Sequence, residues 1–142
     1  MSAFEDPKTG GNIMENRNNK FYFCRTCGTI VGLVSGSPEH LACCGNPMEP
    51  LRANSMDASQ EKHVPVVNVV ESIVSVKVGS EEHPMTAAHH IDWIYLLTQK
   101  GGQRRALTID DKPEAAFALT DGDKPVAVFA HCNLHGLWVT EL

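Results

Sequence analysis

Four of the five cysteines of this chain lie close together in the first half of the sequence, as the pairs Cys24, Cys27 and Cys43, Cys44. They fall within a short unit, residues 20–52, which a polar connector follows. A domain of fewer than about 40 residues usually needs a metal, a disulfide or a partner to hold its fold. The cysteines are the residues that can supply this link, so we expect residues 20–52 to form a cysteine-stapled module.

The overall composition favours metal ligands over disulfides for these cysteines. The whole chain has five cysteines, an odd number, and the N-terminus has neither the basic nor the apolar stretch of a secretory signal. No apolar run reaches about 18 residues, the length that spans a bilayer. We therefore expect a soluble, cytoplasmic protein without a membrane partner, in a compartment that keeps thiols reduced. The net charge of −5 and the scattered Lys and Arg residues argue against a nucleic-acid partner.

The spacing of the cysteines indicates a tetrahedral metal site. Cys24 and Cys27 are separated by two residues and followed by Gly28, which permits the tight turn of a metal-binding knuckle. Four sulfur ligands select zinc or iron. A structural zinc ribbon normally ends in a second pair with the same two-residue gap, whereas Cys43 and Cys44 are adjacent. Adjacent ligands must splay apart, so we expect a distorted tetrahedron, and the ligand type alone leaves both metals possible.

The rest of the chain has the pattern of a mainly β protein. Residues 1–19 are polar and we expect a flexible tail, and residues 53–60 look like a connector with one helical turn around Met56 to Ala58. Short apolar or alternating stretches then predict strands at 64–70, 72–78, 91–97, 105–109, 115–119, 126–130 and 137–139, with Gly101 and Gly102 closing the third. Such spacing suggests an antiparallel β-sandwich over residues 53–142.

A second group of metal-ligand residues lies within the predicted sandwich. It consists of His63, His83, His89, Cys132 and His135. Cys132 and His135 are three positions apart on one loop, and Pro84 excludes a helical histidine pair for His83 and His89. Imidazoles together with one thiolate suit iron, copper or zinc. We interpret the remaining histidines, His40, His90 and His131, as surface or supporting residues.

Three stretches that follow the cysteine module together resemble the desulfoferrodoxin family, the two-iron superoxide reductases. They are Glu61-Lys62-His63-Val64-Pro65-Val66, His83-Pro84-Met85 with His89-His90-Ile91-Asp92-Trp93-Ile94, and Cys132-Asn133-Leu134-His135-Gly136-Leu137-Trp138. The N-terminal cysteines resemble the desulforedoxin module of the same family. The resemblance runs from about Phe21 to the C-terminus. Its departures, a long tail and His90 in place of a common aromatic residue, touch no ligand position.

The resemblance implies two iron ions per chain. Cys24, Cys27, Cys43 and Cys44 would hold the first iron, which would serve electron transfer. His63, His83, His89 and His135 would hold the second iron equatorially, with Cys132 as its axial ligand. The resemblance further implies that the rubredoxin-like N-terminal module precedes an immunoglobulin-like β-sandwich. It also implies a homodimer, a small rubredoxin-like electron donor, and reduction of superoxide to hydrogen peroxide as protection against oxidative stress.

Two charged residues beside His63 are candidates for direct roles in that reaction. Five protein ligands leave an octahedral metal one open position, opposite Cys132, and an anionic thiolate there favours release of peroxide. Superoxide is an anion, so a local positive charge would speed its capture. Lys62 is our candidate for that charge and for ordering a proton-donating water, with a solvated surface lysine as the alternative. The resemblance implies that Glu61 becomes the sixth ligand of ferric iron, with an ordinary exposed carboxylate as the alternative.

Other functions stay open on the sequence alone. The protein could be a non-enzymatic one-electron carrier with two iron centres, a dismutase that also oxidises superoxide, or a zinc-stapled interaction module. Metal analysis and colour would identify the last, because zinc proteins are colourless. Oxygen evolution would distinguish a dismutase from a reductase.

Overall fold

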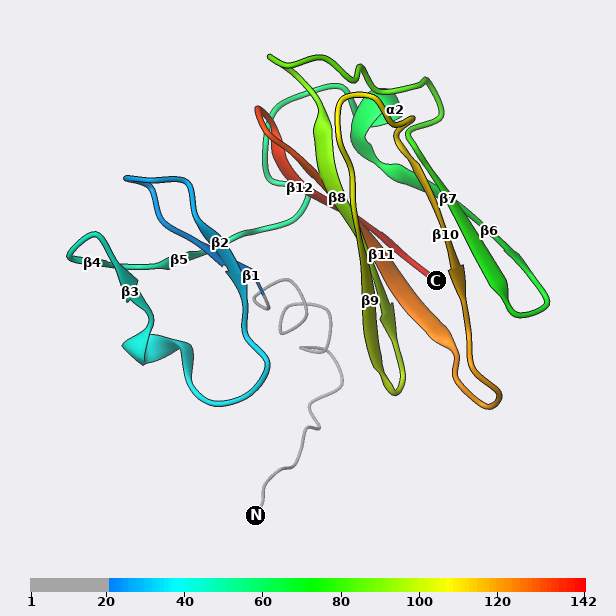
Figure 1. Cartoon of the computed structure of the whole chain (residues 1–142), viewed down its shortest axis with the longest axis horizontal. Coiled ribbons are helices and arrows are strands. Elements are labelled where there is room, and N and C mark those ends of the chain that lie inside the picture. The colour runs from blue at the N-terminus through cyan, green and yellow to red at the C-terminus, as the bar shows by residue number, and fades with distance from the viewer. Residues whose placement is uncertain (1–20) are drawn as a thin grey trace. The chain divides into compact units, whose positions relative to one another are not determined.

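The computed structural model describes residues 21–142, so the tail expected at residues 1–19 lies outside the described residues. The chain divides into two compact units, with the boundary between Arg52 and Ala53. Figure 1 shows that almost all the regular elements of the described part are strands. Within this part, no helix combines the length and the hydropathy that a membrane crossing would need.

The described part of the first unit, residues 21–52, contains five short strands and one 3-10 helix. These are β1 (Phe21–Phe23), β2 (Ile30–Gly32), η2 (Pro38–His40), β3 (Ala42–Cys43), β4 (Asn46–Pro47) and β5 (Glu49–Pro50). Strands β2, β1 and β5 form an antiparallel sheet in that order, and β3 and β4 form a separate hairpin. The buried apolar side chains are few, chiefly Phe21, Tyr22 and Leu51. A core this small agrees with the expectation that the unit depends on its cysteines.

The second unit contains one helical turn and seven strands, all within the described residues. They are α2 (Gln60–His63), β6 (Pro65–Val70), β7 (Ile73–Val78), β8 (Ile91–Thr98), β9 (Gly101–Ala106), β10 (Glu114–Ala118), β11 (Pro125–Cys132) and β12 (Gly136–Glu141). One antiparallel sheet has the order β10-β7-β6 and the other β12-β11-β8-β9. This division into three and four strands is the arrangement of an immunoglobulin-like sandwich.

Alternation along the strands fills the core between the two sheets. In β7 the side chains of Val74, Val76 and Val78 are buried while those between them are exposed. They pack in one cluster with residues of the opposite sheet, among them Ile94 and Leu96 of β8. The period of two that predicts a half-buried strand is therefore the period that builds this core. The expected antiparallel sandwich is confirmed.

Two local expectations were wrong. The helical turn lies at Gln60–His63, and residues 56–58 form bends, because hydrogen bonds of Asn54 to Leu137 and Val139 hold the preceding segment against β12. The pair Gly101, Gly102 begins β9 and does not close β8. The hydroxyl end of Tyr95 on β8 lies where a side chain at Gly102 would be, so a larger residue there would displace the Tyr95 ring.

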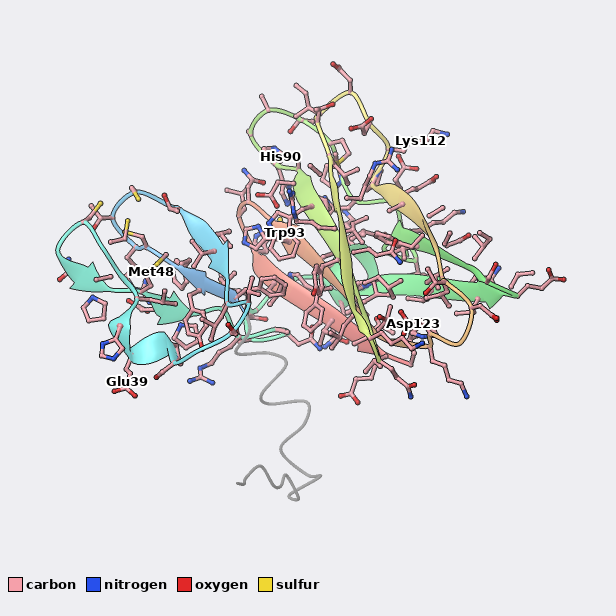
Figure 2. All side chains as sticks on the ribbon, turned by 60° about the horizontal axis from the view of Figure 1, so that its bottom comes forward. Glu39, Met48, His90, Trp93, Lys112 and Asp123 are labelled. Atoms are coloured by element: carbon pink, nitrogen blue, oxygen red, sulfur yellow. The ribbon has the colours of Figure 1, made fainter. Side chains whose placement is uncertain are left out.

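One end of the sandwich gathers the elements that carry the second group of ligand residues. Cys132 at the end of β11 pairs with Ile91 at the start of β8, and α2 lies at this end in Figure 1. His90 and Trp93, labelled in Figure 2, mark the beginning of β8, while Asp123 lies toward the opposite end of the same sheet. The fold thus brings segments from distant parts of the sequence to one edge.

Candidate metal centres

The four cysteines of the first unit converge as the sequence predicts. Their sulfur atoms all lie within 4.8 Å of one another, and none forms a disulfide. The Sγ atoms of Cys27 and Cys43 are 3.5 Å apart, and those of Cys43 and Cys44 are 3.9 Å apart. A tetrahedral metal with bonds of about 2.3 Å to sulfur places its ligands roughly 3.8 Å apart. The four thiols therefore fit a single tetrahedral ion.

Two tight turns bring the sulfur atoms together. The amide of Gly28 donates to the carbonyl of Cys24 at 2.8 Å, and Gly28 has a φ of 80°, which closes the first knuckle. In the second turn, Cys44 itself adopts a φ of 54° and is followed by Gly45 at 78°. A non-glycine residue in this left-handed region is strained, and here the strain accompanies two adjacent ligands that reach one point.

The thiols cannot all ionise without a neighbouring cation. Hydrogen bonds from Thr29 lower the pKa of Cys27 to about 6. The hydrogen bond shared with Cys27 raises the pKa of Cys43 to about 12, and the pKa of Cys44 is raised for the same reason. A bound metal ion supplies the positive charge that four thiolates at this separation require.

The second cluster combines imidazoles with one thiol. His63 ends α2, His83 follows β7, His89 precedes β8 and Cys132 ends β11. One nitrogen of each ring and the sulfur atom lie within 4.8 Å of one another, and His63, His83 and Cys132 are buried. These residues are far apart in the sequence of the domain, yet their nitrogen and sulfur atoms meet at one point.

Backbone carbonyls orient two of the rings. The Nδ1 atom of His63 lies 2.6 Å from the carbonyl oxygen of Ser59, and that of His83 lies 2.7 Å from the carbonyl oxygen of Pro84. Because a carbonyl only accepts, Nδ1 carries the proton in both rings and Nε2 presents its lone pair to the cluster. Carbonyl bonds of this kind are the usual support of metal-ligating histidines.

Two buried nitrogen atoms provide the test of whether a metal fits. The Nε2 atoms of His83 and His89 are buried and have no hydrogen-bond partner among the residues that the structure describes. An unpartnered buried polar atom is costly, so each needs an explanation. Burial, the largest cause, lowers the pKa of His83 to about 4, so the ring is neutral and its lone pair is available. A metal ion would satisfy both nitrogens at once.

His135 joins this cluster from the loop between β11 and β12. Its Nδ1 atom lies 3.1 Å from Nε2 of His63 and 3.9 Å from Sγ of Cys132. Its ring also makes an edge contact with the ring of His89, with centroids 5.0 Å apart. His135 therefore faces the same point with Nδ1, whereas His63 does so with Nε2.

The thiol of Cys132 is fully buried and supported by the backbone. The amide of His135 donates to its sulfur at 3.4 Å. Burial raises the pKa of the Cys132 thiol, so a cation is needed to hold the thiolate in this setting. Trp138 covers the cluster, because its ring stacks on His63 with centroids 4.9 Å apart and its Nε1 donates to the carbonyl of His135.

Asn133 fastens two loops that carry candidate ligands. Its Oδ1 accepts from the amide of His90 at 2.8 Å, and its Nδ2 donates to the carbonyl of Ala88 at 3.0 Å. Its own amide donates to the carbonyl of His90. The sequence alone does not indicate the roles of Asn133 and Trp138. Both residues lie in the stretch from Cys132 to Trp138 that resembles the family, and this position was the only sign in the sequence of a role in supporting the site.

The two charged candidates lie outside the converging group. Glu61 and Lys62 are both exposed on α2, directly before His63. The backbone amide of Glu61 and the hydroxyl of Ser59 lower the pKa of the Glu61 carboxyl, and the hydroxyl lies 3.0 Å from Oε1. Neither residue contributes an atom to the group of ligand atoms within 4.8 Å. Their roles stay predictions.

The other histidines are not members of either cluster. His40 is exposed in η2, and His90 directs Nδ1 to the carbonyl of Thr86. His131 is buried, pairs with Asp92 at 2.8 Å and stacks on Trp93 with centroids 5.4 Å apart. These positions agree with surface or supporting roles.

Fold and sites together define a β-rich metalloprotein with one four-cysteine centre and one centre of histidines and a cysteine. The desulfoferrodoxin family model matches residues 55–141, and the model of the desulfoferrodoxin N-terminal domain matches residues 16–51. The chain belongs to the desulfoferrodoxin family, and the family's two iron centres correspond to these two clusters.

Individual relatives agree with this assignment. The desulfoferrodoxin of Syntrophotalea carbinolica is 47% identical over 120 residues, which cover 84% of this chain and 94% of that protein. The superoxide reductase of Pyrococcus abyssi is 37% identical over 105 residues, covering 62% of this chain and 91% of that protein. The crystal structure of the superoxide reductase from Treponema pallidum superposes with a TM-score of 0.72 at 38% identity. That match covers 85% of this chain and 98% of the other.

Proposed function

We infer that this chain is a superoxide reductase, which converts superoxide to hydrogen peroxide at the second cluster. The observation that carries the inference is the convergence of the His63, His83 and His89 nitrogens on the buried sulfur of Cys132, with His135 facing the same point. Relatives from Treponema pallidum and Pyrococcus abyssi bear the name superoxide reductase. The reaction consumes one electron and two protons for each superoxide that becomes hydrogen peroxide.

We propose that these five side chains hold iron at the second centre. Nitrogen and thiolate ligands suit iron, and the anionic Cys132 sulfur is a strong donor to it. When bound, iron supplies the single electron that the reaction needs. The chain's contribution is to fix the donors: carbonyls orient His63 and His83, and the His135 amide holds the sulfur.

The segment before His63 carries two charged residues that would act on the anionic substrate and on the oxidised iron. We propose that Lys62 attracts superoxide and orders a water that donates a proton, because it is an exposed cation next to a ligand in a chain of net charge −5. We propose that Glu61 becomes a ligand of the oxidised iron after turnover. Its carboxyl has a lowered pKa, so it is ionised at neutral pH and able to serve as an oxygen donor.

The first centre would supply electrons. We propose that Cys24, Cys27, Cys43 and Cys44 hold an iron that exchanges electrons with a small rubredoxin-like carrier, since Cys27 and Cys44 are exposed. Residues 20–52 would form this domain and residues 53–142 the catalytic one. We further propose a homodimer, and a cytoplasmic location because the four thiols of the first centre must stay reduced.

The decisive experiment mixes the reduced, iron-loaded protein with superoxide in the absence of oxygen. We expect the visible spectrum of the ferric centre to appear together with one peroxide per superoxide, and no oxygen. Protein loaded with zinc is the control, because zinc has no redox change. Oxygen release would instead identify a dismutase. If the reduced protein does not react with superoxide, the chain is an electron carrier and not a reductase. If the protein takes up no iron, it is a zinc-stapled module.

A further inference from the structure

The helix α2 that presents Glu61, Lys62 and His63 is too short to be stable alone. It has a single turn, closed by a 2.9 Å hydrogen bond from the amide of Val64 to the carbonyl of Gln60. Nucleation of one turn costs more free energy than its first hydrogen bond returns. The turn must therefore be held in place by contacts with the rest of the domain.

The carbonyl of Glu61, the next one along the helix, has no hydrogen-bond donor within the helix. In a continuing helix, the carbonyl of Glu61 would accept from the amide four residues later, but that residue is Pro65, which has no N–H. The Glu61 carbonyl would then lack an intramolecular donor, as helix ends do. The group that donates to this carbonyl therefore also helps to position α2.

The loop after β7 supplies two donors to this carbonyl. The amide of Glu81 lies 2.9 Å from the Glu61 carbonyl oxygen, and the Oγ atom of Ser80 lies 3.2 Å from the same atom. The loop is itself fastened, because the amide of Gly79 donates to the carbonyl of Glu81 and the amide of His83 to that of Val78. A hydrogen-bonded turn that leads directly to His83 thus holds α2 through the Glu61 carbonyl.

Gly79 allows the two segments to approach this closely. A Cβ atom at Gly79 would lie 2.5 Å from the carbonyl oxygen of Glu61 and 2.9 Å from the carbonyl carbon of Lys62. Both are backbone atoms, which cannot swing aside as the end of a flexible side chain can. Any residue larger than glycine would force α2 and the loop apart.

We propose that residues 79–81 form a positioning element, here called the 79–81 clamp, that fixes Glu61 and Lys62 relative to the second metal centre. The hydrogen bonds of the clamp go to the backbone carbonyl of Glu61, and not to the side chains of Glu61 and Lys62. Because the same loop continues into His83, the charged pair and one ligand are set by one structural unit. The inference rests on the proposed function of Glu61 and Lys62.

Two variants of the iron-loaded protein test the clamp, each with a matched control. Gly79→Ala removes the close approach, and Gly32→Ala is its control because a Cβ there would meet only Phe21 at 3.7 Å. Ser80→Ala removes one donor, and Ser75→Ala removes an exposed hydroxyl on β7. Amide hydrogen exchange at Glu81 reports the clamp directly and does not depend on turnover. The salt dependence of the superoxide rate reports Lys62, and the ferric spectrum reports Glu61.

We expect Gly79→Ala to speed exchange of the Glu81 amide by about tenfold, the effect of losing one hydrogen bond. Both clamp variants should slow the superoxide reaction several-fold, weaken its salt dependence and shift the ferric spectrum, with two irons retained. Ser80→Thr, which keeps the hydroxyl, should restore the parent values. If Gly79→Ala does not fold, Ser80→Ala decides the question alone.

The clamp is overturned if exchange, salt dependence and spectrum in the clamp variants match those of Gly32→Ala and Ser75→Ala. Failure of the proposed function has a different signature. Replacing Lys62 and Glu61 themselves would then leave rate and spectrum unchanged, while the exchange of Glu81 would still respond to Gly79→Ala.

Discussion

The Nδ1 atom of His135 lies 3.1 Å from the Nε2 atom of His63, although the two residues are 72 positions apart in the sequence. Each ring turns a different nitrogen toward the other, and the planes of the two rings are perpendicular. A metal between the four histidines would therefore be bound through Nδ1 of His135 and through Nε2 of His63.

This geometry predicts that His135 is needed to retain the second iron. His135→Ala should reduce the iron content from two ions per chain toward one, because one of five donors is lost, while the spectrum of the first centre persists. Iron analysis and visible spectroscopy measure the change. His40→Ala is the control, since His40 is exposed in η2. Two irons retained by His135→Ala, with an unaltered spectrum, would remove His135 from the ligand set.

Much of this site could be predicted because its ligands sit in short local motifs. Adjacent cysteines, Pro84 after His83, and the Cys132 to His135 spacing are visible in the sequence, and alternation along β7 predicts which side chains are buried. The alternation of buried and exposed residues and the spacing of ligand residues can be recognised from residues that are close in the sequence.

The supports of the site could not be predicted in the same way. The bond between Asn54 and Val139 joins residues 85 positions apart, and Asn133 reaches Ala88 across 45 positions. Gly79 matters because a backbone carbonyl passes within 2.5 Å of where its Cβ would be. Such contacts depend on how distant segments meet, and a single sequence holds no periodic signal for them.

Lys62 should accelerate the capture of superoxide. Lys62→Ala is expected to slow the reaction of the reduced protein by about tenfold at low salt and to flatten its dependence on ionic strength, because an attractive local charge is lost. Rapid mixing at several salt concentrations measures both quantities. Lys77→Ala removes an equal charge from an exposed position on β7 and should have little effect. An unchanged rate and salt slope in Lys62→Ala would exclude the residue from the mechanism.

Glu61 should affect the oxidised state and not the reduction itself. Glu61→Ala is expected to leave the superoxide rate close to that of the parent and to shift the ferric absorption band, since the carboxylate would no longer meet the oxidised iron. Glu141→Ala on β12 should leave the band in place. An inactive Glu61→Ala protein with intact iron would instead show that the carboxylate takes part in the chemistry.

The two centres should be separable by mutation. Cys24→Ser removes one of four sulfur donors, and Cys24 is the buried one, so the first iron should be lost. The second centre, reduced by a chemical reductant, should still react with superoxide at close to the parent rate. Loss of that reaction in a folded protein with its second iron present would contradict the proposed division between electron supply and chemistry.

Asn133 should set how firmly the second centre is held without touching its metal. Asn133→Ala removes the bonds to His90 and Ala88, and two hydrogen bonds of this kind contribute about 1–2 kcal/mol in total. The loop with His89 would then separate more readily from the loop with Cys132. We expect faster release of the second iron to a chelator and a lower unfolding temperature, with the first centre unaffected. Asn68→Ala on β6 is the matched control. Equal release rates from both variants would mean that the two loops are held together by other contacts.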